Sequence, residues 1–187
     1  MTDVLRVAAL VADAWEACDM RYLIGGSLAS SFAGEPRSTL GIDMVVELSD
    51  ASLARFAGRL NPEFYFDLDQ ARSDLRLGLS FNLIHEPTGL KVDVFPSRSP
   101  LARTQMDRRR SIEVCADPSR CLYFYTPEDI LLQKLAWFRQ GGEVSDRQWR
   151  DVVGIVVTQG ASLDRSYLRE HAEEAGVADL LPRALSS

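Results

Sequence analysis

Residue types that could do chemistry occur at three places in the first half of the chain. Gly25-Gly26-Ser27 follows a short apolar stretch. Glycines let a backbone approach a phosphate closely, and free N–H groups at the start of a following helix favour an anion. Gly41 and Asp43 lie two residues apart at the start of a predicted strand, so their side chains would share one face. Asp93 lies between valines in a later strand, where a charge needs a partner or a metal.

Each of these features has a simpler interpretation when it is taken alone. A Gly-Gly pair before a helix is more often only a tight turn. Asp93 could face solvent and pair with Lys91 or an arginine. Arg37, which precedes the Asp43 strand, could equally pair with Glu35. The chemical interpretation therefore depends on how the surrounding elements bring these residues together.

Hydrophobic periodicity predicts the elements that position them. Helical spacing runs over residues 4–15, and a short strand over 21–24 leads into the Gly-Gly turn and a short helix over 28–32. A β-branched strand over 42–48 follows, with a capped helix over 53–60. The strands over 79–85 and 90–95 are joined by a turn-forming sequence, Glu86 to Gly89. We expect residues 97–110 to form an exposed loop or short helix, and 112–115 and 121–125 to add edge strands.

The character of the chain changes to helical at Thr126. Thr126 is a capping residue followed by Pro127 at the first helical position, and Gly141 is the expected end of that helix. Two further helices are expected from Ser145 to Gly160 and from Asp164 to Gly176. We therefore predict an α+β fold in which a mixed sheet flanked by helices (1–125) is followed by a helical segment (126–187) packed on it.

Composition excludes several classes of protein. The 187 residues carry a net charge of −6, which argues against long non-specific contact with DNA or RNA but does not exclude one local basic patch. We expect no sequence-specific binding to DNA. Three cysteines without a CxxC pair and only two histidines make a disulfide framework, a zinc site or a histidine triad improbable. No apolar run reaches the roughly 20 residues that span a bilayer, and the N-terminus lacks a signal-peptide pattern. We expect a cytoplasmic protein without membrane contact.

In their order along the chain, these features resemble the nucleotidyltransferase superfamily, with the DNA polymerase beta-like fold. Its pattern is a Gly-Gly/Ser turn, a helix, an acid-x-acid pair on the next strand and a third acid on a later strand. The run Arg37-Ser38-Thr39-Leu40-Gly41-Ile42-Asp43 is similar to the Arg-x-Thr-x-Asp-Ile-Asp of the bacterial abortive-infection and toxin–antitoxin branch. The helices that begin at Thr126 and Ser145 are also similar, so the resemblance covers roughly residues 20–155.

The resemblance implies that a nucleoside triphosphate is the substrate and Mg²⁺ the cofactor. Asp43 and Asp93 would be the catalytic, metal-binding acids. It also implies a set of nucleotide-binding residues, namely Gly25, Gly26, Ser27, Arg37, Thr39 and Lys134. Lys134 could instead lie on the solvated face of its helix. The implied partners are a protein or RNA acceptor and a cognate antitoxin.

The sequence departs from the family at Gly41, where the first acid of the pair is expected. Glycine offers a metal no ligand, and Glu47 on the same strand face would be roughly 13 Å away. We expect the loss of this acid to lower activity by about a thousandfold or more. The expected function is transfer of a nucleotidyl group to a hydroxyl of a protein, RNA or small molecule, weakened or lost here. The alternative is a non-catalytic nucleotide-binding or toxin–antitoxin regulatory module that keeps the fold.

A group of arginines follows the Asp93 strand, at positions 98, 103, 108, 109 and 110. One interpretation is a platform for RNA or an acidic partner. The other is a solvated loop with ion pairs to Asp107 and Glu113. The net negative charge of the chain favours this second interpretation.

Overall fold

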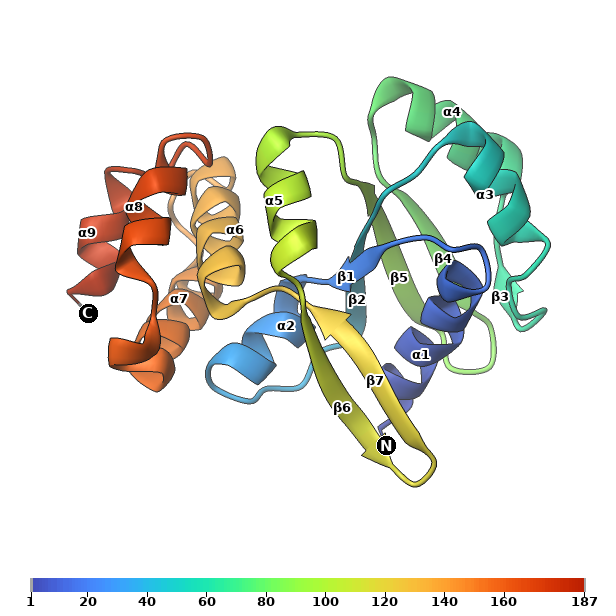
Figure 1. The fold of residues 1–187 in the computed structure, drawn as a ribbon, viewed down its shortest axis with the longest axis horizontal. Coiled ribbons are helices and arrows are strands. Elements are labelled where there is room, and N and C mark those ends of the chain that lie inside the picture. The colour runs from blue at the N-terminus through green and yellow to red at the C-terminus, as the bar shows by residue number, and fades with distance from the viewer. Residues whose placement is uncertain (1, 187) are drawn as a thin grey trace.

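The computed structural model describes residues 2–186 and has a seven-stranded mixed sheet at its centre (Figure 1). The strands follow the order β3-β4-β5-β2-β1-β7-β6. β2 pairs parallel with β5 and antiparallel with β1, and β1 pairs parallel with β7. The strands are β1 Tyr22–Ile24, β2 Gly41–Val46, β3 Phe64–Tyr65, β4 Phe81–His85, β5 Leu90–Pro96, β6 Arg110–Ala116 and β7 Ser119–Phe124.

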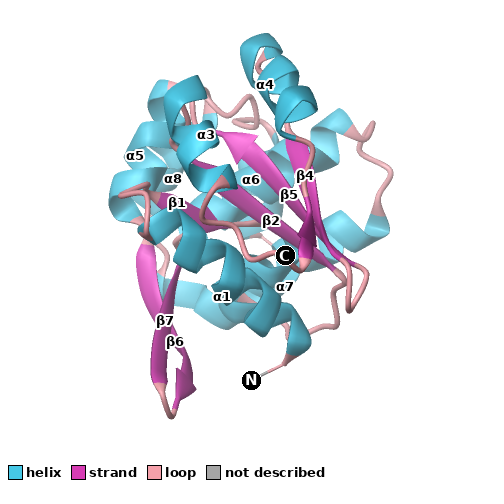
Figure 2. Ribbon diagram, turned by 90° about the vertical axis from the view of Figure 1, so that its right-hand side faces the viewer, coloured by secondary structure: helices cyan, strands magenta, loops and turns pink. Residues whose placement is uncertain are grey.

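Helices cover both faces of this sheet. Figure 2 shows α1 and α3 in front of the sheet and the C-terminal helices behind it. The α-helices of the described residues are α1 Asp3–Glu16, α2 Gly26–Ala33, α3 Asp50–Ala57, α4 Leu68–Leu77, α5 Pro100–Arg108, α6 Pro127–Gln140, α7 Asp146–Gln159, α8 Arg165–Ala172 and α9 Leu180–Leu185. The predicted α+β architecture, a mixed sheet flanked by helices, is confirmed.

Local capping explains why the helices begin where they do. The hydroxyl of Thr126 accepts the Asp129 N–H and Pro127 is the first residue of α6, as the sequence predicts. Ser145 caps α7 and Asp164 caps α8 in the same way. α2 begins at Gly26, two residues before the expected start, so the Gly-Gly turn is itself the helix N-terminus.

Of the two expectations for residues 97–110, the short helix is the one that forms: α5 begins there because Ser99 caps it and Pro100 fits its first turn. Two other places differ from the expectation. The strands expected at the edge form a hairpin in which only β6 is an edge strand. β7 joins β1, since Phe124 pairs with Ile24 and both are buried. The last expected helix, from Asp164 to Gly176, forms as the shorter α8, which ends at Ala172. A separate short helix, α9, follows it.

One hydrophobic core runs from α1 through the sheet into the C-terminal helices. Ile130, Leu131 and Leu135 of α6 are fully buried in it, together with Ile42 and Met44 of β2. α6 follows β7 almost directly, so the helical segment is attached to the sheet without a long linker. Whether residues 1–125 and 126–187 are separate domains stays a prediction.

Among residues 2–186, none of the helices combines the length and the apolar character that crossing a bilayer requires.

Candidate active site

Asp43 and Asp93 are direct neighbours across the parallel strands β2 and β5. Paired residues of adjacent strands point to the same face of a sheet, so the two carboxylates lie side by side. The structure thus brings together two acids that are fifty positions apart in sequence.

Asp43 also lies directly against the N-terminus of α2. A Cβ atom added to Gly26 would lie 1.8 Å from Asp43 Oδ2, and Gly26 has a φ of +57°, which side chains rarely adopt. The backbone N–H of Ser27 donates a hydrogen bond to Asp43. The Gly-Gly turn is therefore shaped around this carboxylate, and glycine is required at position 26 for two separate reasons.

The surroundings of Asp43 disfavour the charged form of its carboxyl group. Burial raises the pKa of Asp43 above its ordinary value, and the neighbouring Asp93 charge raises it further. Lys134, Lys91 and the Ser27 N–H act in the opposite direction without cancelling the effect. A partly buried carboxylate of this kind favours a nearby cation or a proton.

A cleft of about 600 Å³ opens beside Asp43. Gly41 lines it, and a Cβ at position 41 would meet nothing within 4 Å, so there is room for a side chain there. Asp93 is one strand further out and does not line the cleft. The lining residues are Ser27, Arg37, Ser38, Thr39, Leu40, Gly41, Asp43, Arg147 and Gln148.

Arg147 and Gln148 come from the first turn of α7, and no sequence pattern marks them as site residues. The only local signal was Gln148, which follows the Ser145 cap at capping-box spacing; Ser145 Oγ accepts its backbone N–H. Their place at the cleft depends on how α7 packs near α2, which no local pattern encodes.

A largely buried ion network joins Arg37, which lines the cleft, to the C-terminal helices. Arg37 binds Asp151 of α7 with two bonds, Nε to Oδ1 at 2.8 Å and Nη2 to Oδ2 at 2.9 Å. Lys134 Nζ of α6 lies 2.7 Å from Asp151 Oδ2. Arg37 therefore pairs with Asp151 rather than Glu35, and Lys134, only 1% exposed, is not on a solvated helix face. Asp151 was not foreseen.

The pKa values of this network reflect its burial. Burial lowers the pKa of Lys134, although its bond to Asp151 opposes the shift. Burial also acts against the Asp151 carboxylate, but hydrogen bonds from Arg37 and Lys134 outweigh it and hold the Asp151 pKa below its usual value. The two cations thus favour the charged form of the Asp151 carboxylate, and the network orders the residues around it.

The backbone N–H groups expected to hold phosphate are partly occupied by the protein itself. The N–H of Gly25 donates to the Asp43 carbonyl oxygen at 2.8 Å, and that of Gly26 donates to Gln133 Oε1 at 3.3 Å. The Ser27 hydroxyl accepts a hydrogen bond from Arg37 and borders the cleft. Thr39 Oγ1 bonds the backbone of Gly41 and so orders the loop before β2.

The residues present do not fit a two-ion magnesium centre. Lys91 Nζ lies 2.9 Å from Asp93 Oδ1 and so takes one of the two carboxylates as its own partner. Glu47, the acid directly after β2, is bound by Arg21 at 2.7 Å. Within residues 2–186 no three His, Cys, Asp or Glu side chains gather in a way that could hold a metal.

None of the arginines that follow β5 lines this cleft, and Arg108 among them connects two helices. Arg108 of α5 pairs with Glu128 at 3.2 Å and lies 3.6 Å from Asp129, both in α6. Asp107 pairs instead with Arg21, and Glu113 accepts from Ser119. The expected ion pairs of these arginines with Asp107 and Glu113 are therefore wrong for Arg108, because α6 lies closer to it.

Comparison with known proteins identifies the fold. No protein-family model matches the chain, and no curated protein matches its sequence. The crystal structure of an antigenic nucleotidyltransferase-like protein from Paracoccidioides brasiliensis matches with a TM-score of 0.54 at 19% identity, over 96% of this chain and 91% of that one. The solution structure of the antibiotic-resistance factor ANT(2'')-Ia matches with a TM-score of 0.54 at 14% identity, over 100% of both chains. The chain thus has a nucleotidyltransferase-like fold.

Proposed function

We propose that this chain binds a nucleoside triphosphate in the cleft beside Asp43 and transfers its nucleotidyl group to a hydroxyl, at a rate weakened by Gly41. The observation that carries the proposal is the parallel register of β2 and β5, which sets Asp43 beside Asp93 at the N-terminus of α2. The resemblance of the sequence to the nucleotidyltransferase superfamily implies an active site made of these two acids and this turn, and the chain has a nucleotidyltransferase-like fold.

The cleft supplies cationic groups for the triphosphate. Arg37 and Arg147 border it from two sides, and the positive end of the α2 helix dipole points toward it at Ser27. Asp151 holds Arg37 in place, which reduces the entropy that would be lost when a phosphate binds. Arg37, Arg147 and Ser27 are therefore the residues to which we assign phosphate binding.

In the proposed reaction the acceptor oxygen attacks the α-phosphorus. A new O–P bond forms, the bond to the β-phosphate oxygen breaks, and pyrophosphate leaves. Asp43, which lines the cleft and has a raised pKa, is placed to accept the proton of the hydroxyl. The acceptor class, whether protein, RNA or small molecule, and an antitoxin partner rest on the resemblance alone.

The low rate follows from the small number of carboxylates that are free to act at the site. A position that offers a carboxylate in the resembling family is a glycine here, and Asp93 is already paired with Lys91. Loss of one carboxylate of this kind typically costs about a thousandfold in rate. We therefore expect the chain to bind its nucleotide better than it turns it over.

The direct test restores the missing acid. The open space at position 41 means that Gly41→Asp can be accommodated without displacing a neighbour. We expect Gly41→Asp to transfer label from α-labelled ATP, GTP, CTP or UTP to acceptors in a cell lysate, in the presence of Mg²⁺, about a hundredfold or more faster than the natural chain.

A matched control is Gly58→Asp, a glycine-to-aspartate change at an exposed position with an ordinary φ of −76°. It should label no faster than the natural chain. If Gly41→Asp also fails to label any acceptor, and neither protein binds any of the four triphosphates in a calorimeter, the proposed function is wrong. Binding without labelling by either protein would favour a non-catalytic nucleotide-binding module.

A further inference from the structure

Only two of the 21 basic residues are lysines, and both lie beside the acids of this site. Lys134 binds Asp151 at 2.7 Å, and Lys91 binds Asp93 at 2.9 Å. Lys91 is also the register partner of Gly41 in the β2–β5 pair. It therefore lies directly across from the position where the resembling family has a metal-binding acid.

The charges around the site differ from those of a metal centre. Among the charged residues that line the cleft and the ion pairs directly behind it, the cations Arg37, Lys91, Lys134 and Arg147 outnumber the acids Asp43, Asp93 and Asp151 by one. A magnesium site needs carboxylates that are free to bind the ion, whereas Asp93 and Asp151 are each paired with a lysine here. A surplus of fixed positive charge instead attracts a polyanion directly.

Lys91 can reach the cleft from its place on β5. Neighbouring strands lie about 4.8 Å apart, a distance that the four-carbon stem of a lysine spans. Gly41 borders the cleft and places no side chain between it and Lys91. The Lys91 side chain is 53% exposed, so its ammonium group is free to turn from Asp93 toward a phosphate.

We propose that Lys91 supplies the positive charge that a divalent ion would supply in this fold, so that the nucleoside triphosphate binds without magnesium. The inference rests on the proposed function and deepens it: the ligand is the metal-free triphosphate, held by Lys91 together with Arg37 and Arg147. It also gives Gly41 a role, because an acid at that position would pair with Lys91 and withdraw it.

The test is calorimetric titration of ATP, GTP, CTP and UTP in EDTA and in Mg²⁺. We expect the dissociation constant of the preferred nucleotide to differ by less than about threefold between the two conditions. In EDTA, Lys91→Gln should weaken binding by about tenfold. The control Arg59→Gln, at an exposed basic residue that does not line the cleft, should bind within about twofold of the natural chain.

Gly41→Asp provides an independent arm, since it should make binding depend on Mg²⁺. Thermal melts of all variants confirm that each one is folded. Binding by the natural chain only with Mg²⁺, or unchanged binding by Lys91→Gln in EDTA, would overturn this inference and leave the proposed function standing. Absence of binding to any nucleotide in both conditions would overturn both.

Discussion

Gly26 and Gly41 both lie at the site, but they leave very different space around their Cα atoms. A Cβ at Gly26 would overlap Asp43 Oδ2 at 1.8 Å in a backbone conformation with a φ of +57°. We expect Gly26→Ala to destabilise the protein by about 2–4 kcal/mol, through the strained φ and the displaced Asp43, and to abolish nucleotide binding. Urea denaturation and calorimetry measure the two effects.

Gly41→Ala is the matched comparison, because a Cβ at Gly41 would meet nothing within 4 Å. It should change the free energy of unfolding by less than about 1 kcal/mol. Equal stability of the two alanine variants would show that α2 can move away from Asp43 at little cost, which contradicts the tight turn described above.

We expect the charged Asp43 side chain to lower the free energy of unfolding at neutral pH, although the proposed reaction needs it. Its folded pKa lies above the unfolded value, so its contribution to stability is complete below about 3.8 and is lost as the pH rises through the folded pKa. Asp43→Asn keeps an oxygen for the Ser27 N–H and removes the charge. We expect it to raise the free energy of unfolding at neutral pH by on the order of 1 kcal/mol.

This gain should shrink as the pH falls toward 3.8, because the natural side chain is then protonated as well. Urea midpoints of both proteins across the acid-to-neutral range follow the difference. A variant that is less stable than the natural chain at neutral pH would mean that cations near Asp43 outweigh its burial, contrary to the raised pKa.

At the scale of elements, Asp151 links α7 to α6 and to the loop before β2. It binds Arg37 and Lys134 together, and Lys134 is 1% exposed. Asp151→Asn would leave two cations without their counter-charge, one of them fully buried. We expect a loss of about 3–5 kcal/mol in unfolding free energy and weaker nucleotide binding, since Arg37 would no longer be held.

Asp146→Asn, on the exposed first turn of the same helix, is the control. It removes only a favourable interaction with the helix dipole and should cost less than about 1 kcal/mol. A similar small effect of Asp151→Asn would show that the network contributes little and that Lys134 is stable inside the core as a neutral amine.

The sequence predicts those parts of the site that depend on local pattern. Asp43 and Asp93 stand out because an acid in a β-branched strand is unusual, and the Gly-Gly turn because it precedes a helix. Asp151 and Arg147 could not be found in this way, because their role depends on where α7 packs. The sequence suggests Lys91 only as a partner of Asp93, because its position across from Gly41 depends on the register of β2 and β5.

The same distinction applies to the elements. Helix starts at Thr126 and Asp164 were predicted correctly because capping is local. The placement of β7 beside β1 was not predicted. Strand order is a long-range property, and a short apolar strand fits an edge as well as an interior position. Sequence therefore indicates which pieces form, and packing decides which residues meet.

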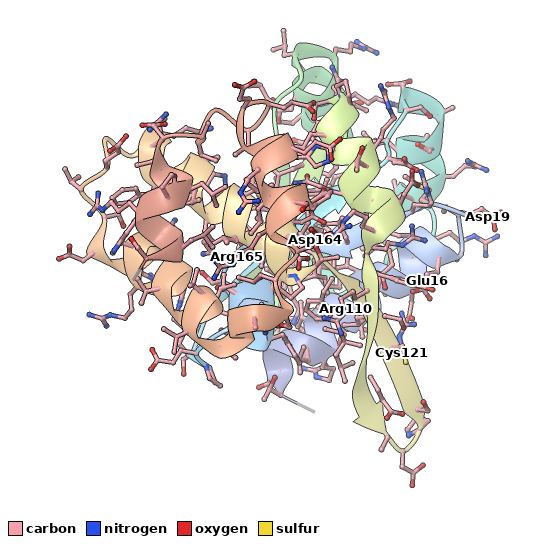
Figure 3. The ribbon with its side chains drawn as sticks, turned by 60° about the vertical axis from the view of Figure 1, so that its left-hand side comes forward. Glu16, Asp19, Arg110, Cys121, Asp164 and Arg165 are labelled. Atoms are coloured by element: carbon pink, nitrogen blue, oxygen red, sulfur yellow. The ribbon has the colours of Figure 1, made fainter. Side chains whose placement is uncertain are left out.

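At the scale of the whole molecule, the sheet and the C-terminal helices are joined by polar as well as apolar contacts. Arg108 of α5 reaches Glu128 and Asp129 of α6, and the Tyr167 hydroxyl of α8 donates to Asp129 Oδ1 at 2.6 Å. Asp164, labelled in Figure 3, lies where α8 begins, and its N–H donates to Glu128 Oε1 at 3.0 Å. These bonds connect both halves around one core.

We therefore expect the chain to unfold in one cooperative step, although it can be divided by composition at residue 125. Trp15, fully buried and stacked on Phe56 at 3.4 Å, reports on the sheet side in a protein that carries Trp137→Phe and Trp149→Phe. Its fluorescence and the helical circular dichroism of that same protein should show urea midpoints that coincide within error. Two separate midpoints would mean that residues 126–187 unfold on their own. The cleft between Arg37 and Arg147 would then lie between two domains that fold independently.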